Sequence, residues 1–348
     1  MSFTQQTNQG VVFHTADAFS AAGGIAHGFA TRIGGVSKPP FDQLNLGMTR
    51  RDDPQDVLEN YRRFCAALGT DVEHLVMTHQ VHQDTILEAK PEHVLEALLE
   101  PIGYDTDGLM TNIPGLCLTI YYADCIPVLL YDPVKKAIAA VHSGWRGTSL
   151  GIAPQAVQKL AARYGSDPRD ILVAIGPGIG PCCFETHDDV PTAMAERLGE
   201  GVQPFCQPLP NGKFSVDLKG ILRWELTQAG VPDEALLKEL QEYFQSRREI
   251  AVEVRVRGPV LQEIDVALSV TAEAGRDRAA VQAAVEQAVR AWFRGERLGR
   301  DVLRAQLGDL VFHCGGVANY RITAPAADVA VGADVLPRLG TLKVEVTA

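Results

Sequence analysis

The sequence of 348 residues lacks the features of several protein classes. It has no run of about 18 or more apolar residues, so no segment is long enough to cross a membrane as a helix. Residues 1–15 lack the basic and apolar stretches of a secretory signal peptide. Basic residues number 32 against 43 acidic ones, a net charge of -11, which disfavours nucleic acid and anionic membranes as partners. We therefore predict a cytoplasmic protein.

Cysteine is also scarce. Seven cysteines are too few for a disulfide scaffold in a chain of this length, so we expect reduced thiols, core residues or ligands. Internal repeats, low-complexity tracts and Gly/Ser linkers are missing as well. Hydrophobic residues make up 46% of the chain, enough for a sizeable core and for two domains.

Two parts of the chain differ in composition. Eight of the nine histidines and six of the seven cysteines precede residue 207. Residues 232–348 are nearly balanced in charge, with 17 acidic and 15 basic residues, and 13 of those bases are arginine. We predict a domain over 1–231 that carries the chemistry and a different module over 232–348.

The periodicity predicts an α/β domain followed by a smaller α+β module. In the first part, a helix is expected over 54–68, entered through an Asp-Pro pair, and a strand over 74–88. In the second part, we expect a helix over 233–247, a strand over 250–257 and an amphipathic helix over 277–293. Strands and helices thus alternate in the first part and are mixed in the second.

A short turn joins two apolar segments, 127–132 (PVLLYD) and 137–142 (AIAAVH). If they pair antiparallel about a turn centred near Val134, facing residues have numbers that sum to about 268. Cys125 then lies opposite residue 143 and beside His142. Turn geometry alone therefore predicts a thiol and an imidazole as neighbours.

A paired cysteine and histidine allow two chemistries. The imidazole of His142 could make Cys125 a nucleophile. Alternatively, both could bind zinc together with a further ligand, leaving a position open for water. The segment MTHQVHQ offers His79 and His82, which would face opposite sides of a strand, so only one could point at the site.

Other residues give weaker signals. Arg32 and Arg146 stand in glycine-flanked turns and are candidates for anion contacts. Asp124, next to Cys125, could orient a ligand histidine or substrate hydroxyls. The vicinal pair Cys182-Cys183 lacks the CxxC spacing of a redox or metal motif, and we expect it to serve packing.

Five blocks of the sequence carry a family resemblance. They are TRIGGVSKPPFDQLNLG, HQVHQD, DGLMTNIPGLCLTIYYADCIPVLLYD, AAVHSGWRGT and AIGPGIGPCCFE, in this order between about residue 10 and about residue 231. Together they resemble the bacterial polyphenol oxidase or laccase-domain family, whose members are also described as multifunctional purine nucleoside enzymes. The resemblance implies a layered α/β sandwich related to the cytotoxic necrotizing factor deamidases.

The resemblance also implies a metal site. In this family the metal is held by the histidine of the Q-V-H block, the cysteine of the A-D-C block and the histidine before G-W-R-G. Those positions are His82, Cys125 and His142. Zinc is the implied metal, with copper as the alternative from the older laccase description. The resemblance thus selects His82 over His79.

The implied activities are phosphorolysis of adenosine, inosine, guanosine and methylthioadenosine, and deamination of adenosine. The partners would be a purine nucleoside and phosphate. Cys125, His142 and Asp124 would take part in catalysis, while Arg32, Asn45 and Arg146 would bind the nucleoside or phosphate.

The chain departs from this family after the block VDLKGILRWELTQAGV (216–231), because it lacks the family's cysteine-containing strand and its terminal Y-R-R and G-R segment. Instead, residues 236–348 resemble the C-terminal region of phage baseplate J-like proteins, a structural part of the tail wedge. This implies a second hypothesis, a structural or interaction protein with an inactive enzyme half that self-assembles through its C-terminal module. A metal-free Cys–His hydrolase is the third.

Overall fold

The computed structural model describes residues 2–48, 51–97, 100–233, 256–293 and 297–347, together with residues 237, 241 and 245. The chain divides into two compact units, Met1–Val256 and Arg257–Ala348. Most of the predicted helix over 233–247 and of the predicted strand over 250–257 lies outside the described residues. The domain boundary after residue 231 stays a prediction.

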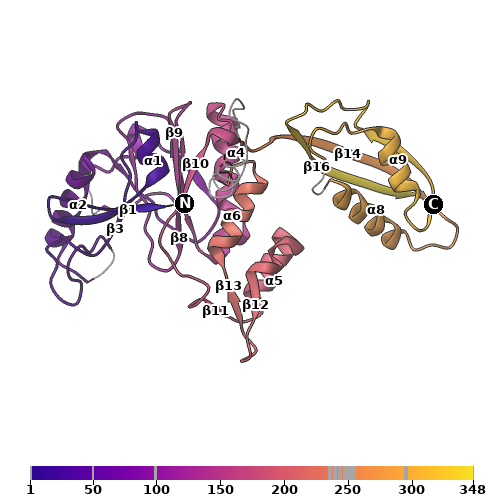
Figure 1. Ribbon diagram of the computed structural model, residues 1–348. Helices are drawn as coiled ribbons and strands as arrows, with labels where there is room; N and C mark the ends of the chain where they lie inside the picture. The colour runs from indigo at the N-terminus through magenta and orange to yellow at the C-terminus, as the bar shows by residue number, and fades with distance from the viewer. Residues whose placement is uncertain are drawn as a thin grey trace. The chain divides into compact units, whose positions relative to one another are not determined.

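A five-stranded sheet forms the centre of the first unit. Its strand order is β10-β8-β9-β6-β5, in which only β5 and β6 run parallel. The strands are β5 (Ile86–Glu88), β6 (Gly108–Thr111), β8 (Ile126–Asp132), β9 (Ala137–Ser143) and β10 (Leu172–Ile175). Figure 1 shows α4 (Ile152–Tyr164) and α6 (Leu218–Gln228) beside this sheet.

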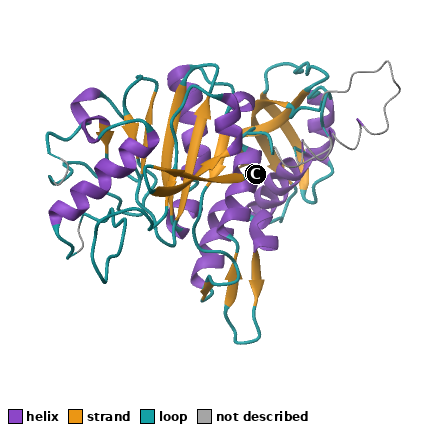
Figure 2. Cartoon of the chain, turned by 60° about the vertical axis from the view of Figure 1, so that its left-hand side comes forward, coloured by secondary structure: helices purple, strands orange, loops and turns teal. Residues whose placement is uncertain are grey.

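Both faces of the central sheet are covered. On one face Val128 and Val141 pack against Ile152 and Leu160 of α4 in the largest core cluster of the unit. On the other face Tyr131 belongs to a cluster built with β2 (Val11–Ala16), α1 (Asp17–Ala22) and β3 (Phe29–Ala30). Burial on both faces explains why β8 and β9 read as almost continuous apolar runs. The predicted layered α/β fold is confirmed (Figure 2).

Smaller elements complete the first unit. Helix α2 (Pro54–Leu68) has the bounds that the sequence predicts, because the Asp53 side chain caps its first turn and Gly69 ends it at a φ of 80°. The remaining elements are β1 (Phe3–Asn8), β4 (Leu75–Val76), β7 (Cys117–Leu118), α3 (Trp145–Ser149), β11 (Glu185–Thr186), α5 (Asp189–Leu198), β12 (Cys206–Pro208), β13 (Phe214–Val216) and 3₁₀ turns at Val72–His74, Pro91–His93, Pro168–Asp170 and Glu200–Phe205.

One sequence prediction about local structure is wrong and one is displaced by a residue. The predicted strand over 74–88 is interrupted, since β4 ends at Val76 and β5 begins at Ile86. The predicted antiparallel hairpin of β8 and β9 forms, and Ile126 faces Ser143, so facing residues sum to 269 where the sequence predicts about 268. Its loop has four residues and is held by the Asp132 carboxylate, which accepts hydrogen bonds from two loop N–H groups. Cys125 lies directly before β8, one residue outside the paired strands.

The second unit is an α+β module, as predicted. Its central strand β14 (Val260–Ala272) pairs antiparallel with β15 (Val317–Ala324) and parallel with β16 (Val335–Thr347). Alternate residues of β14 pack on α8 (Arg278–Trp292) and α9 (Arg304–Phe312), which gives this unit a core of its own. Helix α8 lies where the amphipathic pattern over 277–293 predicts a helix.

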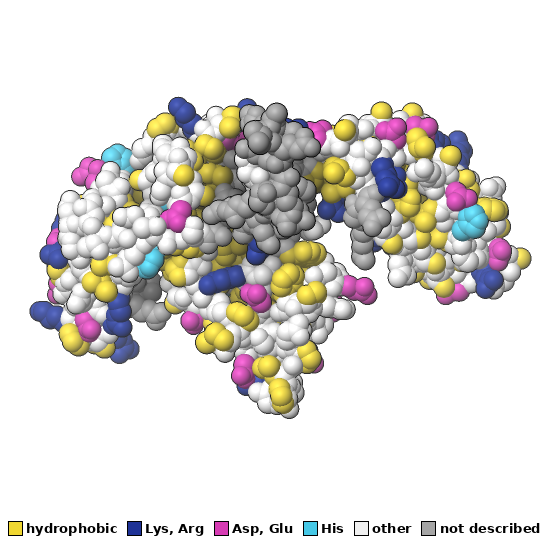
Figure 3. Space-filling model, viewed as in Figure 1, with side chains coloured by type: hydrophobic (Ala, Val, Ile, Leu, Met, Phe, Trp, Pro, Cys, Tyr) yellow, Lys and Arg dark blue, Asp and Glu magenta, His cyan; other side chains and the backbone are white. Residues whose placement is uncertain are grey.

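The charged side chains on the described surface are distributed as expected for a chain with more acidic than basic residues. On the face drawn in Figure 3, Lys and Arg side chains of the described residues are scattered among acidic and uncharged ones and form no continuous basic stripe. Within the described parts of the chain, every helix is too short or too polar to cross a lipid bilayer.

Candidate metal centre

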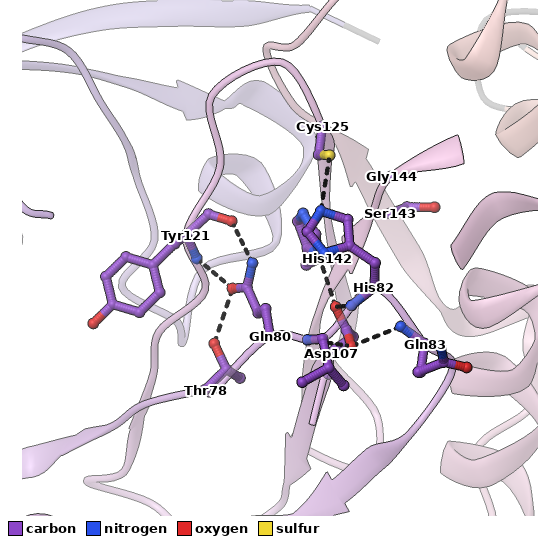
Figure 4. Close-up of polar contacts among 12 residues, drawn as sticks. Thr78, Gln80, His82, Gln83, Asp107, Tyr121, Cys125, His142, Ser143 and Gly144 are labelled. Carbon is purple, nitrogen blue, oxygen red and sulfur yellow. Dashed lines mark hydrogen bonds and ion pairs between the residues drawn. The ribbon is translucent and has the colours of Figure 1, made fainter. Parts of the chain in front are cut away.

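Three side chains from three separate segments converge in the first unit. His82 lies in the loop between β4 and β5, Cys125 directly precedes β8, and His142 lies near the end of β9. One ligand atom from each residue lies within 4.8 Å of the others. The Cys125 Sγ is 4.0 Å from His82 Nε2, and the two imidazole rings stand edge to face with centroids 4.9 Å apart. Figure 4 shows the thiol facing the rings.

Space for this cluster is left by a glycine. Because Ile126 faces Ser143, Gly144 is the next residue along β9, beside Cys125. A Cβ atom on Gly144 would lie 2.9 Å from Cys125 Sγ and 3.2 Å from His82 Cδ2. The cluster therefore requires a residue without a side chain at position 144. Arg146, which the sequence places in a glycine-flanked turn, lies instead in the short helix α3, which begins at Trp145.

A buried carboxylate, Asp107, holds two of the three segments. Its Oδ2 accepts hydrogen bonds from the backbone N–H groups of Val81 and Gln83, at 3.0 and 2.9 Å. Its Oδ1 accepts from the backbone N–H of His82 at 3.0 Å and lies 2.9 Å from His142 Nδ1. Asp107 is fully buried, so these four donors replace its contacts with water.

These contacts set the orientation of both imidazoles. His82 has a φ of 60°, a left-handed conformation that residues other than glycine rarely adopt. Three consecutive N–H groups that point at the Asp107 carboxylate stabilise this conformation. At His142, the contact of Nδ1 with Asp107 leaves Nε2 as the nitrogen available to a ligand.

The site is electrostatically coupled. Burial lowers the pKa of His142, but its hydrogen bonds to Asp107 and Cys125 outweigh burial and raise the pKa to about 9. Burial raises the pKa of Asp107, while the hydrogen bonds from His142 and the backbone lower it overall. With no metal bound, the pair is therefore an imidazolium and a carboxylate at neutral pH. A metal ion that binds Nε2 must displace a proton.

Gln80 connects the histidine loop to the cysteine loop. Its Oε1 accepts from Thr78 Oγ1 at 2.9 Å and from the backbone N–H of Tyr121 at 2.7 Å. Its Nε2 donates to the Tyr121 carbonyl at 2.8 Å. The segment before His82 and the segment before Cys125 are thereby fixed to each other (Figure 4).

The loop that follows β10 packs against the backbone of Asp124 and Cys125. The Ile179 N–H donates to the Asp124 carbonyl at 2.8 Å. A Cβ on Gly178 would lie 2.8 Å from the Cys125 carbonyl oxygen, so this loop approaches the backbone as closely as only glycine allows. Gly178 therefore serves close packing against Cys125.

The other residues that the sequence predicts to take part in binding or catalysis differ in how close they lie to the three converging side chains. Arg32, Asn45 and Asp124 line the same cleft as the three converging side chains. Arg32 donates through Nε to the Asp42 carbonyl at 3.0 Å, and Asn45 donates to the Asp52 carboxylate at 2.8 Å, so both already have partners in the cleft rim. Their roles in binding remain predictions.

Arg146 and His79 stand apart from the converging cluster. Arg146 is exposed, and its guanidinium lies 4.2 Å from the centre of the Trp145 ring. Its role in phosphate binding remains a prediction. His79, the alternative ligand left open by strand geometry, pairs with the Asp105 carboxylate at 2.7 Å, and both side chains are exposed.

Sequence reasoning missed Asp107 and Gln80, whereas Gly144 could be singled out as a small residue that leaves room for a ligand beside the Cys–His pair. Asp107 and Gln80 both stand inside blocks that carry the family resemblance, yet nothing local marks their roles. Asp107 acts on N–H groups about 25 residues earlier and on a ring 35 residues later. Only the assembled sheet brings these groups together.

Known families match both parts of the chain. Residues 26–248 match the sequence model of the family described as multi-copper polyphenol oxidoreductase laccase. The chain belongs to this family. Residues 264–345 match a second description, the baseplate J-like protein C-terminal domain. The match to the laccase family model thus extends past residue 231, the residue at which the resemblance of the sequence blocks ends.

Curated relatives from the laccase family carry the name purine nucleoside phosphorylase. YlmD of Geobacillus stearothermophilus is 37% identical over 217 residues, which are 61% of this chain and 78% of the relative. The relative from Deinococcus radiodurans is 38% identical, over 60% of this chain and 77% of its own length. Human LACC1 is 38% identical over 59% of this chain, which spans 45% of the human protein.

Solved structures of the laccase family share the fold. YlmD from Geobacillus stearothermophilus aligns with a TM-score of 0.59 and 33% identity over 67% of this chain and 85% of that structure. The Bacillus licheniformis protein YfiH aligns with a TM-score of 0.57 and 35% identity over 60% of this chain and 78% of that structure.

Proposed function

We propose that this chain is a zinc-dependent purine nucleoside phosphorylase that also deaminates adenosine. The observation that carries the proposal is the convergence of two imidazoles and one thiol on a cleft. Relatives at 37–38% identity named purine nucleoside phosphorylase support it, and the family model that matches residues 26–248 covers all three side chains. The nucleosides adenosine, inosine, guanosine and methylthioadenosine are the proposed substrates, together with phosphate.

The donor set fits a catalytic metal. Imidazole nitrogen and thiolate sulfur are both ligands of zinc, and three protein ligands leave a fourth position open, as in catalytic zinc sites, with copper as the alternative metal. Asp107 occupies His142 Nδ1 and so leaves Nε2 for the ion, which is the usual arrangement around metal-bound histidine. Zinc held in this way would act as a Lewis acid and lower the pKa of a coordinated water to about 7.

The remaining cleft residues have proposed roles in binding. Tyr121 and Tyr122 line the cleft and provide aromatic surface for a flat purine. Asp124 is exposed beside Cys125 and would orient the ribose hydroxyls or a ligand. Arg32 and Arg146 are the proposed cationic contacts for phosphate. In phosphorolysis a phosphate oxygen bonds to the anomeric carbon of ribose as the bond to the purine breaks. In deamination the oxygen of water replaces the amino group at C6.

Product analysis tests this proposal. The purified protein is incubated with each nucleoside, with and without phosphate, and free base and ribose 1-phosphate are measured together with bound zinc. We expect base release that depends on phosphate. Cys125→Ala and His142→Ala should lose zinc and turnover together. The matched control Cys314→Ala, at a half-buried thiol of the second unit, should keep both.

Two outcomes would overturn the proposal in different ways. A protein that binds zinc in the three-residue site but turns over no nucleoside would favour the structural or interaction hypothesis. The similarity of residues 264–345 to a baseplate protein is the observation behind that alternative. Turnover without metal, with a substrate adduct trapped on Cys125, would instead establish the Cys–His hydrolase.

A further inference from the structure

Two neighbouring cysteines outside the proposed metal centre have their thiols in contact. The Sγ atoms of Cys182 and Cys183 are 3.2 Å apart, and both residues are exposed. Side chains of adjacent residues usually diverge, because they point to opposite sides of a strand and to different faces of a helix. Here a turn brings them together, since the N–H of Cys183 donates to the Gly180 carbonyl at 3.0 Å.

The turn that carries this pair is anchored on both sides. Before it, the Ile179 N–H bonds to the Asp124 carbonyl at 2.8 Å. Within it, Ser215 Oγ donates to the Pro181 carbonyl at 2.7 Å. After it, Glu185 of β11 pairs with Ser215 of β13. The close approach of the thiols therefore belongs to a turn held by the surrounding fold.

Accessibility, and not pKa, sets this pair apart from the other cysteines. Burial raises the pKa of Cys65 to about 12 and that of Cys117 to about 11, but the hydrogen bond with Cys182 raises the pKa of Cys183 as well. Cys65 is buried, and the others are half-buried: Cys117, Cys125, Cys206 and Cys314. Oxidisable thiols are typically accessible and stand next to a second, resolving thiol. Cys182 and Cys183 are the only two of the seven cysteines, all within the described residues, that are exposed.

We propose that Cys182 and Cys183 are a modification site, a dithiol that hydrogen peroxide or another two-electron oxidant closes to a vicinal disulfide. In the first step a thiolate attacks peroxide: an S–O bond forms, the O–O bond breaks, and the leaving hydroxide takes up a proton to become water. In the second step the neighbouring sulfur attacks the sulfenic acid: the S–S bond forms, the S–O bond breaks, and a second water leaves. Two thiols are oxidised as one peroxide is reduced.

Mapping of one tryptic peptide tests this proposal. The folded, full-length protein is treated with a small molar excess of peroxide, its remaining thiols are alkylated, and it is digested without reduction. Cleavage after Arg169 and Arg197 releases peptide 170–197, which contains both cysteines and no other. We expect this peptide to lose two hydrogens and to carry no alkyl group. Reduction with dithiothreitol before alkylation should restore two alkylation sites.

Matched controls come from the same digest. Peptides 198–213 and 305–321 each contain one cysteine, Cys206 and Cys314, and should remain alkylated. In Cys182→Ser the oxidation of Cys183 should stop at a sulfenic acid that a dimedone probe traps. Peptide 170–197 with two alkyl groups after peroxide, a sulfinic acid in place of the disulfide, or a cross-link to another cysteine would each overturn the proposal. The readout is independent of nucleoside turnover.

Discussion

At the level of single residues, Gly144 decides whether the three converging side chains fit together. We predict that Gly144→Ala weakens zinc binding by about tenfold or more, because the new Cβ would lie 2.9 Å from Cys125 Sγ and force that ligand to move. Titration of zinc against a chelator of known affinity measures the effect. Gly147→Ala is the matched control, since its Cβ would meet ordinary contacts of 3.4–3.5 Å. Equal affinities for the two variants would contradict the prediction.

The Asp107 carboxylate has a different role. It would not bind the metal itself, but it orients residues that would. In Asp107→Asn an NH₂ group would replace one oxygen and face N–H donors. We predict zinc affinity lower by about 10–100-fold, as for other groups that orient metal ligands. The free energy of unfolding should fall by about 3 kcal/mol, because the buried network loses its negative charge and one of its two acceptor oxygens.

Zinc titration and denaturant unfolding measure the two effects of Asp107→Asn. The matched control is Asp105→Asn, which removes an exposed carboxylate two residues away that pairs with His79. It should change both quantities little. If Asp107→Asn lowers stability but keeps full zinc affinity, Asp107 serves the fold alone.

The sequence predicts the ligands better than the groups that position them. His82, Cys125 and His142 could be named because their residue types suit a metal and two of them share a hairpin. The roles of Asp107 and Gln80 could not be predicted, because their partners are backbone groups far away in the sequence. Local sequence patterns identify residue types with suitable side chains. The partners of a buried carboxylate are backbone N–H groups that become its neighbours only in the folded chain.

At the level of elements, α6 carries a carboxyl group with an unusual environment. Glu225 is buried, neither of its side-chain oxygens has a hydrogen-bond partner among the described residues, and burial raises its pKa to about 8. In the unfolded chain a glutamate ionises near 4.5. The folded state therefore holds a proton that the unfolded state releases between pH 4.5 and pH 8. Stability must fall as the pH rises through that window.

We predict that Glu225→Gln removes this dependence. The wild-type protein should lose roughly 2–4 kcal/mol of unfolding free energy from this group between pH 5 and pH 8.5, and the variant should not. Urea unfolding of both proteins across this range measures the difference. Glu196→Gln, at an exposed position of α5, should keep the wild-type slope. A variant with unchanged slope would mean that Glu225 ionises normally in the folded protein.

The elements also show where local patterns fail. Helix α2 is predicted to the residue, because Asp53, Pro54 and Gly69 mark its ends. The hairpin is found but its register is displaced by one, since the apolar segments do not reveal that Asp132 closes a four-residue loop. The predicted strand over 74–88 is interrupted between Val76 and Ile86. This interval contains His82, whose left-handed backbone is stabilised by Asp107 and has no local signal.

At the level of the whole molecule, the second unit has the core of an independent domain. Alternate residues of β14 and buried residues of α8 and α9 form a hydrophobic cluster whose described members all belong to the second unit. We predict that a fragment of residues 257–348 folds alone and unfolds cooperatively in denaturant. Circular dichroism and two-dimensional NMR spectra check this. The longer fragment 233–348 should be no less stable.

An insoluble or molten fragment 257–348 would show that residues before 257 belong to the core of this module. In that case the predicted boundary after residue 231 would describe the domains better than the two compact units do. A folded fragment would also allow its self-association, predicted from the baseplate resemblance, to be measured by sedimentation.

The shared carboxylate of Asp107 has a thermodynamic consequence for metal capture. Both histidine-bearing segments are fixed to it before any ion arrives, so their loss of conformational freedom accompanies folding and not binding. The entropy change on metal binding should therefore include only a small contribution from ordering of the chain. An ion whose preferred geometry differs from the fixed arrangement would have to strain the protein or forgo a ligand, which makes this rigidity a source of selectivity between metals.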